Sequence, residues 1–135
     1  MVDISSEKQN LIAKTCQKFG VKILLVFGSQ VEGRTHRESD LDLAFAGKKL
    51  SFEELAEFNL ELQKVFQEDK VDTLNLFAAN PLILKRVFDN HQIIYLEDRF
   101  LYHNLASYAV KSYIETKFLR ENLKNRLEEK YVRNR

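Results

Sequence analysis

The pattern of hydrophobic and polar positions predicts four strands. Residues 21–27 form a largely apolar run that ends at a Gly-Ser pair, and residues 40–46 begin with two acidic positions that alternate with leucines. Residues 71–76 alternate apolar and polar side chains, and residues 93–95 form a shorter apolar segment. Alternation is typical of a strand with one buried face, and a short continuous apolar run is typical of a fully buried strand.

Helical periodicity occupies the stretches between and after these strands. Ser51 is followed three residues later by Glu54, the spacing of a capping box that begins a helix. Gly20 is placed to end the first helix, and Pro81 can occupy the first turn of another. The four longer helices that we expect cover about residues 6–19, 51–68, 80–90 and 98–135.

The order of these elements indicates the fold class. Strands interleaved with helices predict an α/β or α+β fold, in which helices are layered on a small mixed sheet. The sequence contains no internal repeat, low-complexity segment or linker. We therefore expect a single domain over residues 1–135.

Composition and charge restrict the functional classes. The 135 residues include 21 Lys and Arg and 20 Asp and Glu, so no net field favours nucleic acid or a membrane surface. The single cysteine, Cys16, cannot form an internal disulfide, fits a reducing compartment and is expected in the core. The N-terminus lacks the features of a signal peptide, and no apolar run is long enough to cross a bilayer. We expect a cytoplasmic protein that binds neither membranes nor, directly, nucleic acid.

Candidate chemistry is concentrated where the first strand ends and the second begins. A helix that starts at Ser29, after a turn at Gly28, would present free backbone N–H groups to a phosphate. Asp40 and Asp42 are two residues apart on a strand, so their carboxylates share one face. Together these features can bind a nucleoside triphosphate with Mg²⁺. Taken separately, the Gly-Ser pair is also typical of an ordinary turn and the Asp-x-Asp of a solvated strand end.

This combination resembles the nucleotidyltransferases of the DNA polymerase β superfamily, whose signature is a Gly-Ser turn, a short spacer and an Asp-x-Asp. Within that superfamily the chain is similar to the minimal nucleotidyltransferases (MNT), short proteins that act as antitoxins to helical HEPN-domain ribonucleases. The resemblance covers a catalytic core at about residues 21–76. It extends to the C-terminal helical segment, about residues 98–135, only through length and helical pattern.

The resemblance assigns three carboxylates to catalysis and to metal binding: Asp40, Asp42 and Asp72. It implies that the first two hold Mg²⁺ ions and that the third shares the catalytic metal and helps to deprotonate the acceptor hydroxyl. The alternative for Asp72 is an exposed residue of an edge strand.

The resemblance also implies a phosphate-binding set: Gly28, Ser29, Gln30 and Ser39. The glycine allows close approach of the backbone, Ser29 donates its hydroxyl and amide, and Ser39 can orient the first aspartate. Gln30 departs from the family, which often has arginine there. Arg34 or Arg37 can supply that charge instead, or they are ordinary loop residues.

The function implied by the resemblance is transfer of AMP from ATP to a tyrosine of a cognate HEPN toxin, which silences it. The expected assembly is a hetero-oligomer with the toxin, with a homodimer as the alternative. Beyond about Leu119 the last helix is longer than so small a domain can cover, which favours a partner-binding segment over a free tail, with nucleic-acid binding as a weaker alternative. Two other functions remain open: an antitoxin that acts by complex formation alone, and a nucleotidyltransferase acting on a small molecule such as an aminoglycoside.

Overall fold

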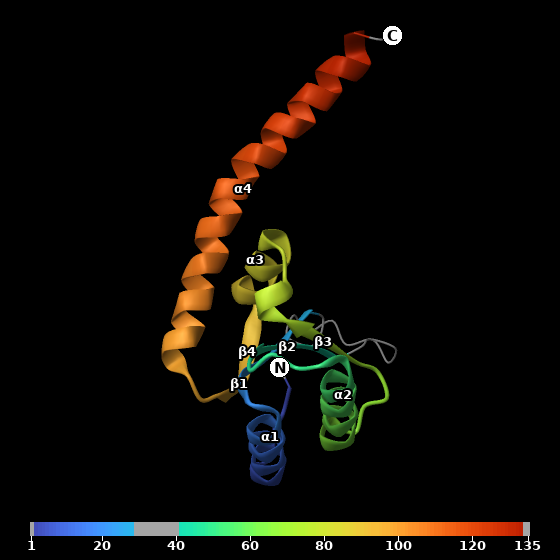
Figure 1. Ribbon diagram of the computed structural model, residues 1–135, viewed down its shortest axis with the longest axis vertical. Helices are drawn as coiled ribbons and strands as arrows, with labels where there is room; N and C mark the ends of the chain where they lie inside the picture. Colours follow the sequence, from blue (N-terminus) through green and yellow to red (C-terminus); the bar gives the residue numbers. More distant parts are fainter. Residues whose placement is uncertain (1, 29–40, 134–135) are drawn as a thin grey trace.

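The computed structural model describes residues 2–28 and 41–133 and contains a four-stranded mixed sheet layered with helices (Figure 1). This confirms the fold class predicted from the pattern. The elements, in chain order, are α1 (Ser6–Phe19), β1 (Val21–Phe27), β2 (Leu41–Gly47), α2 (Phe52–Phe66), β3 (Val71–Asn75), the 3₁₀ turn η2 (Leu76–Ala78), α3 (Pro81–Asp89), β4 (His91–Leu96) and α4 (Arg99–Arg133).

The strands are arranged in the order β3-β2-β1-β4. β1 pairs antiparallel with both β2 and β4, whereas β2 and β3 are parallel. A parallel pair needs a crossover connection, and α2 provides it. β4 is an edge strand, as predicted, but it covers six residues where the sequence pattern indicated three.

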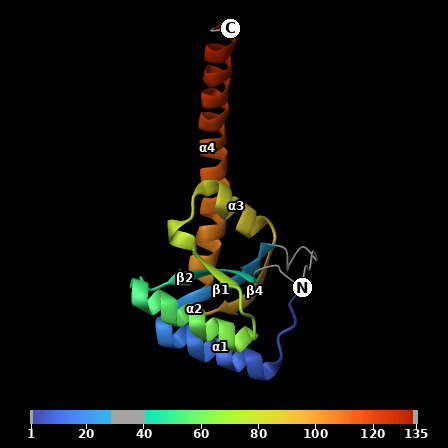
Figure 2. The same ribbon diagram turned by 90° about the vertical axis from the view of Figure 1, so that its right-hand side faces the viewer.

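Two layers of helices bury the two faces of the sheet. α1 and α2 lie on one face, and α3 and the first half of α4 lie on the other (Figures 1 and 2). Under α1 and α2, the centroid of the Phe58 ring lies 5.3 Å from that of Phe19 and 5.4 Å from that of Phe45. Under α3 and α4, Leu25 and Ala44 of the sheet pack in one cluster with helix residues such as Leu84, Leu105 and Ala109. The sheet therefore separates two apolar cores.

Local signals set most of the element ends. Gly20 ends α1 in the left-handed conformation, with φ of 69°. Ser51 and Glu54 form the predicted capping box of α2. α2 ends at Phe66, slightly earlier than expected. β3 also ends early, because the Asn75 side chain accepts a hydrogen bond from the backbone N–H of Phe77 at 3.0 Å and starts the 3₁₀ turn.

α4 is the longest element and projects beyond the rest of the described chain (Figure 2). Its 35 residues correspond to about 52 Å at 1.5 Å per residue. Its first half packs against α3, and every residue from Glu121 to Tyr131 is exposed. Within the described residues, no helix is long and apolar enough to cross a membrane.

Candidate functional site

A row of paired residues crosses the sheet where β1 ends and β2 and β3 begin. The register pairs Asp72 with Asp42 between the parallel strands, and Asp42 with Phe27 between β2 and β1. Side chains at paired positions point to the same face, and neighbouring strands are about 4.8 Å apart. The two carboxylates are therefore neighbours. Ala44 and Leu74, two residues further along each strand, belong to the cluster under α3 and α4, so the carboxylates lie on that face.

Gly28 closes the row at the end of β1. Its φ is 81°, in the left-handed region that favours glycine. A Cβ atom at this position would lie 2.5 Å from Oδ2 of Asp42, inside any normal contact distance. Only glycine lets the carboxylate lie directly against the backbone at this turn. The role predicted for Gly28, close approach of a phosphate to its backbone, stays a prediction.

The two carboxylates differ in their exposure. Asp42 is partly buried, whereas Asp72 is exposed on the edge strand β3. The exposure of Asp72 agrees with the alternative of an ordinary edge-strand residue. Its register with Asp42 is the feature that favours a shared site, because a slip of one residue would turn it to the opposite face.

Four predicted site residues, Ser29, Gln30, Ser39 and Asp40, lie outside the described residues, so their roles stay predictions. Among the described residues, no group of three or more acidic, histidine or cysteine side chains could hold a metal ion. Asp42 and Asp72 nevertheless fit Mg²⁺, which prefers hard oxygen ligands and usually completes its coordination with phosphate oxygens and water.

A histidine and a tyrosine meet at the other end of the row, a contact that the sequence pattern did not predict. His91 of β4 pairs with Phe27 of β1. Its Nε2 lies 2.7 Å from the hydroxyl of Tyr102, and its Nδ1 lies 3.2 Å from the carbonyl oxygen of Phe88. Because a carbonyl only accepts, Nδ1 carries the proton in the neutral ring and Nε2 accepts from the tyrosine. This bond ties the start of α4 to the row.

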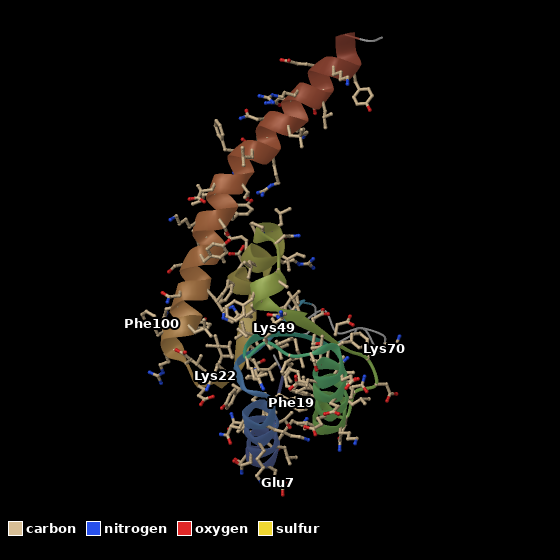
Figure 3. The ribbon with its side chains drawn as sticks, in the orientation of Figure 1. Glu7, Phe19, Lys22, Lys49, Lys70 and Phe100 are labelled. Atoms are coloured by element: carbon tan, nitrogen blue, oxygen red, sulfur yellow. The ribbon has the colours of Figure 1, made fainter. Side chains whose placement is uncertain are left out.

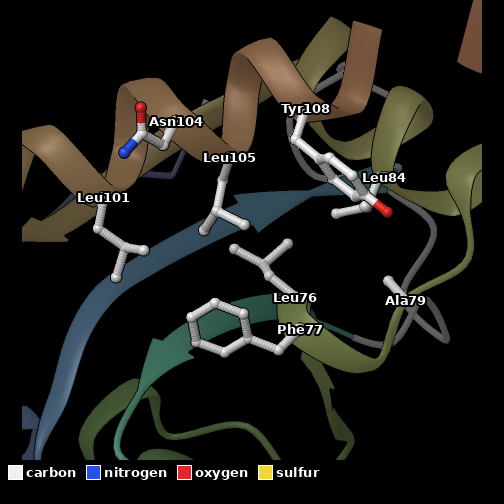
Figure 4. A pocket seen from close by; sticks show the side chains of 8 residues that line it. All are labelled: Leu76, Phe77, Ala79, Leu84, Leu101, Asn104, Leu105 and Tyr108. Atoms are coloured by element: carbon white, nitrogen blue, oxygen red, sulfur yellow. The ribbon is translucent and has the colours of Figure 1, made fainter. Parts of the chain in front are cut away.

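A pocket of about 410 Å³ also opens on the carboxylate-bearing side of the sheet, between η2, α3 and α4 (Figure 4). Its lining residues are Leu76, Phe77, Ala79, Leu84, Leu101, Asn104, Leu105 and Tyr108. The walls are mostly hydrocarbon, with one amide and one hydroxyl. Sequence reasoning missed this pocket because its walls come from three elements that only the tertiary fold brings together.

Cys16 is separate from this site. It is fully buried between α1 and the opposite face of the sheet. Burial raises the pKa of its thiol to about 12, so the group stays protonated at neutral pH. The prediction that Cys16 is a core residue is confirmed, and a role as a nucleophile is excluded by its burial and protonation.

A family model described as polymerase beta, nucleotidyltransferase matches residues 9–100 of the chain. The matched range contains the Gly-Ser turn, the Asp-x-Asp and Asp72. Among curated proteins, none matches this chain.

Several solved structures share the fold over nearly the whole chain. A chain of a toxin–antitoxin complex with AMP-PNP has a TM-score of 0.74 at 20% identity, covering 89% of this chain and 98% of that one. A chain in the complex of a tri-AMPylated Shewanella oneidensis HEPN toxin with an MNT antitoxin has a TM-score of 0.69 at 18% identity, covering 90% and 97%. A chain of the MntA–HepT toxin–antitoxin has a TM-score of 0.69 at 16% identity, covering 92% and 99%. At these identities the likeness establishes a common fold.

Proposed function

Because the chain belongs to the polymerase β nucleotidyltransferase family, we propose that it is an antitoxin that transfers AMP from ATP to a tyrosine hydroxyl of a cognate HEPN ribonuclease toxin. The transfer silences the toxin. The likeness to chains of toxin–antitoxin complexes, one with AMP-PNP and one with an AMPylated HEPN toxin, supports the substrate, the partner and the reaction. The observation that carries the proposal is the register that places Asp72 beside Asp42, with Gly28 against the same carboxylate.

The reaction is an in-line displacement at the α-phosphorus of ATP. The tyrosine oxygen forms a bond to that phosphorus, the bond to the oxygen that bridges to the β-phosphate breaks, and pyrophosphate leaves. The carboxylate of Asp72 takes the proton of the attacking hydroxyl. Exposure suits this residue to the task, because the acceptor belongs to another protein and must reach it from solvent.

The remaining site residues hold the triphosphate. The backbone at Gly28 and the hydroxyl and amide of Ser29 approach the phosphates, with Gln30 beside them and Ser39 orienting Asp40. Asp40, Asp42 and Asp72 are the residues that would hold Mg²⁺, which when bound neutralises phosphate charge and acidifies the acceptor hydroxyl.

The proposal also covers organisation and location. The catalytic core is residues 21–76, the C-terminal helical segment is residues 98–135, and both belong to one domain. The active assembly is a hetero-oligomer with the toxin. We place it in the cytoplasm, where ATP is available and a thiol such as Cys16 remains reduced.

The test is to purify the chain with the product of the adjacent gene and to measure intact masses. With ATP and Mg²⁺, the mass of the partner should increase by whole AMP units, and its ribonuclease activity should fall. The Asp40→Ala/Asp42→Ala variant should give no mass increase and should lose Mg²⁺-dependent ATP binding. Asp69→Ala is the control, since this exposed carboxylate lies near the start of β3 and outside the carboxylate row.

Three results would contradict the proposal. Full neutralisation by the double variant, without any mass change, would indicate an antitoxin that acts by binding alone. Transfer of AMP to an aminoglycoside such as kanamycin, with none to the protein partner, would indicate a small-molecule acceptor. Undiminished transfer by the double variant would remove the carboxylates from the mechanism.

A further inference from the structure

The exposed part of α4 carries an apolar stripe that continues the core-facing side of the helix. Leu123 follows Leu105 by 18 residues, or about five turns, so both point in the same direction. Leu105 is buried between α4 and the rest of the domain, whereas no other described element packs against the C-terminal half of α4 (Figure 3). The stripe consists of Leu119, Leu123, Leu127 and Tyr131, which are 66%, 59%, 47% and 71% exposed. These residues are exposed to solvent, although they repeat at the spacing that is typical of a buried helix face.

Charge is distributed around this stripe in one consistent way. At 3.6 residues per turn, the basic residues lie within about 80° of its centre on both sides, and the acidic residues lie about 120° or more away. The basic flanks are Arg120 and Lys124 on one side and Arg126 and Lys130 on the other, and the acids on the far side are Glu121, Glu128 and Glu129. Arg120 is held in place by a 2.6 Å hydrogen bond to the hydroxyl of Thr116.

We propose that this stripe is the docking surface for an amphipathic helix of a partner protein whose apolar seam is flanked by Asp and Glu. The inference rests on the proposed function and names the surface by which the toxin is held. A leucine seam between basic flanks is complementary to a leucine seam between acidic flanks. A second copy of this chain fits poorly, because both flanks are basic and would face basic flanks in either orientation.

The direction of α4 connects this surface to the candidate site. α4 rises from the side of the sheet that carries α3, which is also the face of Asp42 and Asp72 (Figure 1). The stripe points to the same side of α4 as the residues packed on α3. A partner on the stripe therefore lies on the carboxylate-bearing side of the sheet, where its hydroxyl can be presented for transfer.

The experiment compares two pairs of full-length variants with matched controls. Leu123→Gln/Leu127→Gln, called the seam variant, removes the centre of the apolar stripe. The control, Ile114→Gln/Phe118→Gln, makes the same change on the opposite side of α4, at residues that are 63% and 68% exposed. Binding of the purified partner protein, the product of the adjacent gene, is measured by calorimetry. The seam variant should bind on the order of tenfold more weakly or worse, with the control close to the parent chain.

The flanks are tested by charge reversal. Lys124→Glu/Arg126→Glu should weaken binding and reduce its dependence on salt, whereas Lys111→Glu/Lys117→Glu should change it little. Acid-to-lysine changes on the binding helix of the partner should restore affinity to the reversed variant. Circular dichroism checks that all four variants keep their helix content.

Each opposing outcome has a distinct signature. Sedimentation can show whether the chain alone forms a dimer. A dimer that dissociates in the Leu123→Gln/Leu127→Gln variant would assign the stripe to a second copy. Seam-dependent binding to phosphatidylserine vesicles or to single-stranded RNA, without binding of the protein partner, would also overturn the proposal. If all variants bind the partner equally and still transfer AMP, the docking surface is wrong and the proposed function stands. If binding depends on the stripe but AMP is never transferred, the docking surface stands and the proposed function is wrong.

Discussion

Replacing Gly28 with alanine should slow nucleotide transfer far more than it destabilises the fold. The backbone of Gly28 has φ of 81°, and holding alanine in the left-handed region costs roughly 1–2 kcal/mol. The new Cβ would also lie 2.5 Å from Oδ2 of Asp42, about 1 Å closer than an ordinary contact. The carboxylate must move by a comparable distance, and a displacement of about 1 Å at a reacting centre can reduce the rate on the order of 100-fold.

Gly20→Ala is the matched control. Gly20 also has positive φ, 69°, and its added Cβ would meet Cβ of Lys48 at 2.9 Å, remote from the carboxylates. Both variants should lose about 1–2 kcal/mol in urea unfolding. Only Gly28→Ala should lose transfer, measured as AMP added to the partner per unit time. A Gly28→Ala enzyme with the parent rate, or equal losses of rate in both variants, would refute the positioning of Asp42 by this turn.

Three further predictions follow from individual side chains. Asp72→Asn should keep near-parent ATP affinity in calorimetry and lose most of its turnover, whereas Asp69→Asn should keep both. Normal turnover of the Asp72→Asn variant would mean that Asp72 is an ordinary edge-strand residue. Phe58→Ala should cost about 3–5 kcal/mol in urea unfolding because Phe58 is fully buried, and Phe52→Ala, 87% exposed, should cost little. Stability should fall as the pH rises above about 9, because the Cys16 thiol then ionises in the unfolded chain but keeps its proton in the folded one, where its pKa is raised to about 12. Unfolding at pH 8 and pH 10 should show a smaller fall for Cys16→Ala, and an equal fall would contradict this.

The ends of most elements could be predicted because they depend on neighbours in sequence. Gly20 ends a helix through its own backbone freedom, and Ser51 with Glu54 satisfies the free N–H groups of the next helix three residues away. The long last helix was also predictable, since no residue interrupts its pattern. The 3₁₀ turn after Asn75 was missed because an alternating pattern does not distinguish the last strand residue from the first turn residue.

The candidate site could be predicted only in part. The residue types around Gly28 and Asp42 and the spacing between them are properties of the sequence, and they were sufficient to indicate phosphate and metal chemistry. Asp72 stood out as a carboxylate within an alternating apolar strand, and the resemblance supplied its role in the site. No local signal relates it to Asp42, which lies 30 residues earlier in the chain. The contact between His91 and Tyr102 has no sequence signal either, because it joins a strand to a helix.

The sequence by itself determined the order and approximate extent of the main helices and strands, where most helices are capped, and which chemical groups the chain offers. Only the tertiary structure decided that β1 lies at the centre of the sheet, that Asp42 and Asp72 are paired, and that α4 rises from the face they occupy. The physical reason is that caps and periodicity depend on hydrogen bonds and side chains within a few residues. Strand order and register are instead set by burial of side chains that are distant in sequence, such as Leu74 and Ala109 in one apolar cluster.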